Sequence, residues 1–232
     1  MRIQTFPRIL LLVGAVLWLA PLPPARGTPV GPCTAGTVAS YLATPCTIDD
    51  KEFTFSSISA VPTSGASQVS ASDVTVTPIA TPGNPGLLFT STDWNIFSGT
   101  QETLIGYTVT VLPGGNPIDD ATLTLAGVFT ALPPGDAVTV DEHLCLGGGS
   151  CPGGFLDLTT SSNGSVSTTF SPVGTIDVVD DIVLSAVVPV SAALTSVEND
   201  FSEVPVPEPS TLLLLGSGLA GLGGIAWRRT RK

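Results

Sequence analysis

Apolar and polar residues alternate in short runs along most of the chain. Thr108–Leu112 and Thr122–Ala126 alternate strictly, which predicts strands with one face in a core and the other face in water. Similar runs recur about every eight to twelve residues, with Pro, Gly, Asn and Asp between them, as in antiparallel sandwiches and barrels. We therefore predict an all-β fold, an antiparallel β-sandwich-like domain over residues 28–202. The expected strands are Cys46–Phe55, Val69–Ile79, Gly86–Thr92, Thr103–Leu112, Ala121–Thr130, Ala137–Leu144, Phe155–Thr160, Ser165–Phe170 and Asp181–Val190.

Three shorter segments and one tryptophan add to this expectation. Gly36–Leu42 suits one or two helical turns, and the Asn-Gly pair in Ser162–Ser165 predicts a hairpin turn. Trp94 has apolar neighbours on both sides, so we expect its ring to pack in the core. Ala193–Ser202 is expected to lead the chain out of the domain.

The N-terminus has the parts of a secretory signal peptide. Arg2 and Arg8 give a basic start, and Ile9–Ala20 is an apolar core of about a dozen residues. A proline-rich break and small residues then precede Thr28, as a cleavage site requires. We predict a signal peptide over residues 1–27, which implies export.

The C-terminus also has three parts in a fixed order. Residues 203–210 form a Pro-rich linker that cannot be helical, because proline fixes φ at alternating positions. Thr211–Trp227 carries no charge and is long enough, at ~1.5 Å per residue, to cross most of a ~30 Å hydrocarbon core as a transmembrane helix. Residues 228–232 are a basic tail that would stop at the cytoplasmic face. Its basic residues are Arg228, Arg229, Arg231 and Lys232.

This tail closely resembles the PEP-CTERM sorting signal of Gram-negative bacteria. The name-giving triplet stands at Pro207, Glu208 and Pro209, followed by the apolar span and the basic end. The resemblance implies export through the secretion machinery and retention in the inner membrane. It also implies cleavage near the triplet by an exosortase-type transpeptidase. The domain would then be an ectodomain between a signal peptide and a transmembrane helix, released to the cell surface or the extracellular matrix.

Charge is distributed very unevenly along the chain. Nineteen carboxylates face eight basic residues, and Lys51 is the only basic residue between Arg26 and Arg228. Without its two ends the chain would carry a net charge of about −18, which repels nucleic acids and anionic lipid. We therefore exclude nucleic-acid binding and expect no resident cofactor. Acidic doublets leave Ca²⁺ open as a ligand, although such doublets are also ordinary turn residues. The doublets are Asp49-Asp50, Asp119-Asp120, Asp141-Glu142 and Asp180-Asp181.

The four cysteines form two close pairs in the sequence, Cys33 with Cys46 and Cys145 with Cys151. Four cysteines allow three connectivities, of which we favour this local pairing because each partner is the nearest candidate. Zinc would call for CxxC-type spacing, which is absent from the sequence. Disulfides require an oxidising compartment, which agrees with export.

No catalytic constellation can be recognised in the sequence. The single histidine, His143, could serve a Ser-His-Asp enzyme, but no GxSxG motif marks a nucleophile. We expect His143 to be a solvated residue at a strand end. The leading hypothesis is a non-enzymatic surface or matrix protein, in line with the association of such sorting signals with exopolysaccharide and biofilm. The alternatives are a calcium- or carbohydrate-binding adhesion module and, less favoured, a secreted hydrolase.

Overall fold

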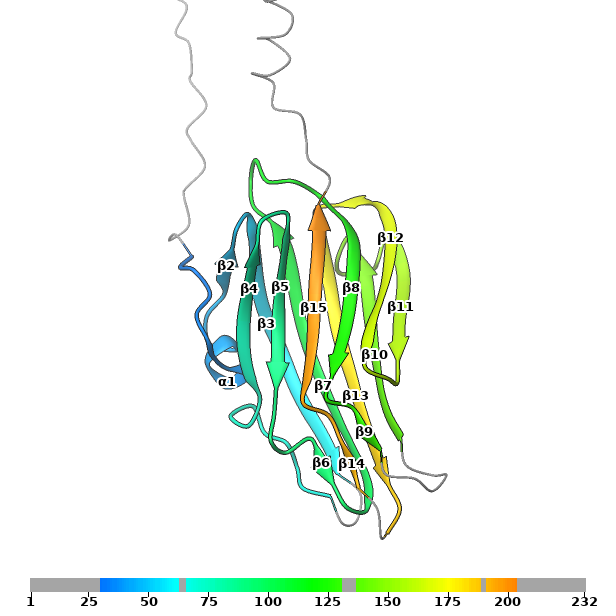
Figure 1. Ribbon diagram of the computed structural model, residues 1–232. Helices are drawn as coiled ribbons and strands as arrows, with labels where there is room; N and C mark the ends of the chain where they lie inside the picture. The colour runs from blue at the N-terminus through cyan, green and yellow to red at the C-terminus, as the bar shows by residue number, and fades with distance from the viewer. Residues whose placement is uncertain (1–29, 63–65, 131–136, 189–190, 204–232) are drawn as a thin grey trace, which may run out of the picture.

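The computed structural model of the protein describes residues 30–62, 66–130, 137–188 and 191–203. Two six-stranded antiparallel sheets lie face to face, and a small three-stranded sheet closes one end of the pair (Figure 1). One helical turn, α1 (Val38–Tyr41), precedes the first long strands. The predicted all-β antiparallel sandwich is confirmed.

The first sheet has the order β1-β4-β5-β15-β8-β12, and the second has the order β11-β10-β13-β7-β3-β2. In the first sheet the strands are β1 (Gly36–Thr37), β4 (Thr75–Thr81), β5 (Asn84–Thr90), β15 (Ser196–Glu203), β8 (Ile118–Ala126) and β12 (Gly164–Val173). In the second they are β11 (Gly154–Thr160), β10 (Ala137–Leu146), β13 (Thr175–Ala186), β7 (Gly99–Val111), β3 (Lys51–Pro62) and β2 (Cys46–Ile48). The third sheet consists of β6 (Asn95–Ile96), β14 (Ala192–Ala193) and β9 (Phe129–Thr130).

Strict alternation decides which side chains fill the space between the two large sheets. In β13, every second residue from Ile176 to Ala186 is buried, and its neighbours lie on the outer face. The same period of two holds along β7 and β8, as the sequence predicts for half-buried strands. Each strand therefore contributes one apolar row to a common core.

Aromatic rings join the two sheets at the middle of this core. Tyr107 of β7 stacks on Phe55 of β3 with ring centroids 5.3 Å apart, and both rings contact Phe89 of β5. Phe201 of β15 lies edge-on to Tyr107 at 6.4 Å. Such aromatic pairs add to the free energy of burial, so these contacts fix how the sheets face each other. Trp94 is buried with 1% of its surface exposed, which confirms the prediction for its ring.

Several expected boundaries are shifted in the structure. The helical turn within Gly36–Leu42 is confirmed as α1, but the strand expected at Val69–Ile79 begins only at Thr75. The strand expected at Asp181–Val190 already begins at Thr175 and ends at Ala186. The expected strand Cys46–Phe55 is divided, because the turn at Asp49, with φ at 53°, separates β2 from β3.

The hairpin predicted at Ser162–Ser165 is wrong. β11 before it pairs with β10, and β12 after it pairs with β8 in the other sheet. The turn therefore carries the chain from one sheet to the other. Asn163 pins it to the end of β8, because its Oδ1 accepts a hydrogen bond from the backbone nitrogen of Val128 at 2.7 Å.

The prediction that Ala193–Ser202 leads the chain out of the domain is also wrong. Most of that segment is β15, which lies in the interior of the first sheet between β5 and β8 and pairs with both. Its register places Asn199 opposite Leu87 of β5 and Leu123 of β8, so the last described strand completes the sheet.

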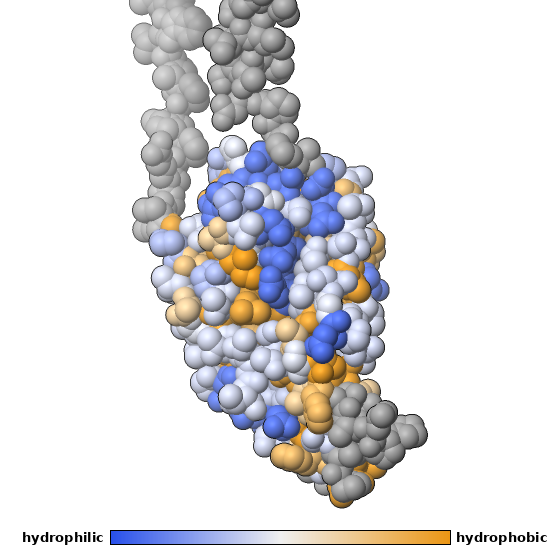
Figure 2. Space-filling model, viewed as in Figure 1, coloured by the Kyte–Doolittle hydropathy of each residue, from blue (hydrophilic) through white to orange (hydrophobic). Residues whose placement is uncertain are grey.

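The two ends of the sandwich differ in surface chemistry. β15 ends at the upper end in Figure 1, while β6, β9 and β14 lie at the opposite end. Large exposed apolar residues gather near this lower end, among them Phe97, Phe129 and Val188, and Figure 2 shows apolar surface there and hydrophilic surface around the upper end. The polar end is thus the end at which β15 and the described part of the chain stop.

Candidate functional site

A buried lysine lies at the upper end of the sandwich. Lys51 opens the inward row of β3 in phase with Phe53 and Phe55, and its side chain is fully buried. Its ammonium forms ion pairs with the carboxylates of Asp50 and Glu203, the latter at the end of β15. The lysine therefore joins the second sheet to the last residue of the first.

Asn116 completes this group of side chains, which we call the Lys51 cluster. Its backbone nitrogen donates to Oδ2 of Asp50 at 2.6 Å, and its Nδ2 donates to Oε2 of Glu203 at 3.1 Å. Burial raises the pKa of Asp50, but hydrogen bonds from Lys51, Glu203 and Asn116 outweigh it and leave that pKa lowered. For Glu203 burial dominates and the pKa is raised. Of the two carboxyls, Glu203 is therefore the more readily protonated.

The Lys51 cluster overlaps the one group of acids in the described residues that lies close enough to share a cation. Ligand oxygens of Asp49, Asp50 and Glu203 fall within 4.8 Å of one another. However, each oxygen of Asp50 and Glu203 already contacts Lys51 or Asn116, and Asp49 is exposed. A calcium ion would have to displace a buried ammonium, so the geometry fits lysine better than a metal at this place.

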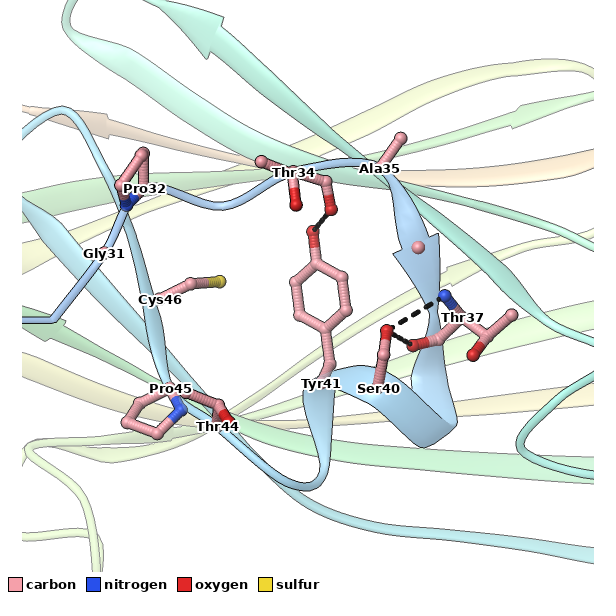
Figure 3. A pocket seen from close by; sticks show the side chains of 11 residues that line it. Gly31, Pro32, Thr34, Ala35, Thr37, Ser40, Tyr41, Thr44, Pro45 and Cys46 are labelled. Atoms are coloured by element: carbon pink, nitrogen blue, oxygen red, sulfur yellow. Dashed lines mark hydrogen bonds between the residues drawn. The ribbon is translucent and has the colours of Figure 1, made fainter.

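A second candidate site is an open cavity of about 510 Å³ beside α1 (Figure 3). Tyr41 stands between the loop that carries Thr34 and the helical turn, and its hydroxyl donates to the Thr34 carbonyl at 2.9 Å. The hydroxyl of Ser40 bonds the backbone of Thr37 and closes the turn. The Cys33–Cys46 disulfide holds the two arms of the loop together.

The chemistry of this cavity is neutral. Its walls are threonine and serine side chains, proline rings, Cys46, backbone and one tyrosine, and no carboxylate or ammonium of the described residues contributes to them. Burial raises the pKa of Tyr41, so its hydroxyl stays protonated. The cavity can thus offer hydrogen bonds and apolar faces to an uncharged ligand. The lining includes Pro32, Thr34, Ala35, Tyr41, Thr44 and Pro45.

His143 lies within β10 and not at its end. It is on the outer face, where its Nδ1 lies 2.6 Å from Oδ1 of Asp157 on β11. The hydroxyl of Thr159 on the same strand is bonded to Asp141. These contacts form a solvent-exposed polar row across the two strands, consistent with a solvated residue.

The structure forms both disulfides of the local pairing, Cys33–Cys46 and Cys145–Cys151. The second closes the loop between β10 and β11. That loop is further tied by the backbone nitrogen of Gly149, which donates to Asp177 at 2.7 Å.

Two buried acids were not foreseen from the sequence. The doublets Asp141-Glu142 and Asp180-Asp181 lie inside strands, so each doublet places one acid on either face. Glu142 and Asp180 point into the core and are fully buried. The sequence did contain a signal for this burial, because each acid stands in a row of alternate apolar residues. One such row is Val138-Val140-Glu142-Leu144.

The sorting triplet Pro207, Glu208 and Pro209 and the basic tail Arg228–Lys232 lie outside the described residues, as do the predicted signal peptide and the span Thr211–Trp227. The triplet begins four residues after Glu203. Within the described part of the chain, no helix has the length and apolar character needed to span a bilayer.

Comparison with protein families decides the role of the tail. A family model for the PEP-CTERM protein-sorting motif matches residues 205–232. The chain carries a PEP-CTERM protein-sorting motif at its C-terminus. No curated protein matches it. The PEP-CTERM match supports an exported protein that exosortase-type machinery sorts at the membrane, and it begins two residues beyond the Lys51 cluster.

Proposed function

We propose that the protein is a non-enzymatic component of the cell surface or extracellular matrix, delivered as a folded β-sandwich and freed from an inner-membrane anchor by an exosortase-type enzyme. The observation that carries this proposal is the position of the sorting motif directly after β15 and its Lys51 cluster. The domain that the sorting step delivers would then be held together as far as Glu203, the last residue of its last strand.

The surface of the sandwich supports a matrix role. His143 lies in an exposed polar row with Asp157, and among the described residues no hydroxyl or thiol is hydrogen-bonded to it. The strong negative charge keeps the delivered domain soluble and away from anionic lipid. Two disulfides stabilise loops in an oxidising compartment.

Substitution of Glu208 by alanine is expected to block processing. The charged centre of the triplet is lost, so the protein should accumulate in the membrane fraction of its native host at a mass that still includes the residues after the cut. Immunoblots of membrane and extracellular fractions provide the measurement. The neighbouring substitution Val206→Ala serves as the control and should be processed normally. Equal masses and equal locations for Glu208→Ala and wild type would refute the cleavage step.

A specific observation favours a carbohydrate-binding role for the delivered domain. The cavity beside α1 is lined by hydroxyls, proline rings and Tyr41, without any charged side chain. No partner for the hydroxyls of Thr34 and Thr44 is found among the described residues, so both are available to a ligand. The volume of the cavity, about 510 Å³, lies within the usual range for small-ligand sites. A neutral sugar unit of an exopolysaccharide has the matching hydroxyls and apolar ring faces.

Filling the cavity should abolish such binding. Ala35→Trp places a large ring in it, whereas Ala39→Trp adds the same ring at an exposed position of α1 that does not line it. Calorimetric titration with neutral and uronic-acid oligosaccharides is expected to give binding of the neutral series only, lost in Ala35→Trp and kept in Ala39→Trp. Binding that survives Ala35→Trp, or that prefers the acidic series, would rule out the cavity as the site.

A further inference from the structure

Two carboxyl groups face each other in the core of the sandwich. Glu142 of β10 and Asp180 of β13 are direct partners across the two strands, and both are fully buried. Side chains at directly opposed positions of antiparallel strands lie in close contact. We call these residues the interior acid pair.

Hydrogen bonds reach only one member of the pair. Nδ2 of Asn199 on β15 donates to Oδ1 and Oδ2 of Asp180 at 2.8 Å each, and it also contacts the hydroxyl of Tyr107 at 2.7 Å. Asn199 thereby ties the first sheet to the second through Asp180. Neither Oε1 nor Oε2 of Glu142 has a partner among the described residues.

Among the described residues, no cation is paired with either acid of the pair. β7 contributes the neutral Tyr107, while β5 and β8 contribute Leu87 and Leu123 on either side of Asn199. Lys51 of β3 is engaged by Asp50 and Glu203. The remaining charged groups of these strands lie at half-buried or exposed positions, apart from Asp200, which is buried: Glu52, Glu102, Asp119, Asp120, Asp141, His143, Asp177, Asp181, Glu198 and Asp200.

We propose that the interior acid pair is a pH-sensitive element that holds protons when the domain is folded and loosens the two sheets as those protons are lost. An unpaired carboxylate in an apolar core costs several kcal/mol, whereas the protonated acid is neutral and can itself donate a hydrogen bond. The folded domain therefore holds the pair with at least one proton, and deprotonation places two like charges opposite each other.

The electrostatics agree in direction with this geometry. Burial, reinforced by Asp180 and Asp200, raises the pKa of Glu142 well above its usual range. Burial raises the pKa of Asp180 to about 7, although the hydrogen bond from Asn199 and the charge of His143 act to lower it. On β15, burial and the neighbouring Glu198 raise the pKa of Asp200 to about 7.

The sign of the pH effect follows from these shifts. In the unfolded chain the same acids titrate near about pH 4, so the folded state binds more protons than the unfolded state above that pH. Stability is therefore fully present below about pH 4 and is lost as pH rises towards about 7. For each retained proton the folding equilibrium constant falls about tenfold per pH unit in this window.

The experiment uses the full chain in a non-ionic detergent at fixed ionic strength. Urea midpoints are measured by pulse proteolysis at about pH 5 and about pH 8, where the linkage predicts a lower midpoint at the higher pH. Glu142→Gln and Asp180→Asn keep the shape of the side chain without the titrating proton. Each variant should therefore have a higher urea midpoint than wild type at the higher pH, and a smaller drop of the midpoint between the two pH values. Asp141→Asn is the matched control, since it removes one charge from the outer face of the same strand and should leave the drop in place.

Three results would overturn the proposal. One is a wild-type midpoint that does not fall between the two pH values. Another is the same drop in Glu142→Gln and in Asp141→Asn, which would assign the effect to overall charge. If the core variants fail to fold, infrared spectra of the wild type decide: a protonated-carboxyl band near neutral pH is expected, and its absence would refute the proposal.

Discussion

A chain truncated after Leu194 is expected not to fold, whereas a chain truncated after Pro205 is expected to keep both sheets. The first truncation removes β15, which pairs with β5 on one side and with β8 on the other. It also removes the buried side chains of Val197, Asn199 and Phe201 from the core. Without an interior strand, the first sheet separates into two parts with unpaired edges.

The two truncations are compared by near-ultraviolet circular dichroism and by resistance to protease. The shorter chain should lose the aromatic signal of the buried rings around Tyr107 and should be digested throughout. The longer chain retains Glu203 and should unfold in one cooperative step. Protease resistance in the chain that ends at Leu194 would show that β15 is dispensable.

Substitution of Lys51 by methionine is expected to destabilise the domain by about 3 kcal/mol, because it leaves the carboxylates of Glu203 and Asp50 without their cation. Glu203 is nearly inaccessible in the structure, while Asp50 is partly exposed and retains some solvation. We therefore expect the lower end of the range known for broken buried ion pairs. Urea denaturation of purified wild type and variant gives the difference in free energy of unfolding.

The double variant Lys51→Met with Glu203→Gln provides the control for this prediction. Loss of one carboxylate relieves the uncompensated charge, so the double variant should be more stable than Lys51→Met alone. A loss below about 0.5 kcal/mol in the single variant would mean that the cluster behaves as an ordinary surface ion pair.

Periodicity predicted the architecture well because the long strands are amphipathic. Thr122–Ala126 alternates strictly, and the structure buries Leu123 and Leu125 while both threonines remain on the outer face. The local cysteine pairing was also predictable, since a short loop limits the choice of partner. Both features are local in sequence.

The misassigned segments depend on contacts that are distant in sequence. β15 places Asn199 at an inward position, so its pattern resembles a polar exit segment, and only pairing with β5 and β8 makes it an interior strand. The turn at Asn163 has the composition of a hairpin, yet turn chemistry alone does not say which sheet each flanking strand joins.

The buried charges escaped notice for a related physical reason. Lys51 stands in phase with Phe53 and Phe55, and Glu142 in phase with Val140 and Leu144. Ionisable residues are rarely buried without a partner, so composition favours the solvent for each of them. The burial of Lys51 depends on Glu203, which reaches it from the other sheet, whereas Glu142 is buried without a hydrogen-bond partner among the described residues.

The placement of β15 has a consequence for the order of events during secretion. An exported chain crosses the membrane from its N-terminus, so β5 and β8 arrive well before the strand that lies between them. The gap in the first sheet stays open until residue 203 has emerged, a few residues ahead of the sorting motif. Maturation of the sandwich is therefore one of the last steps of translocation, and it takes place close to the membrane where the sorting enzyme acts.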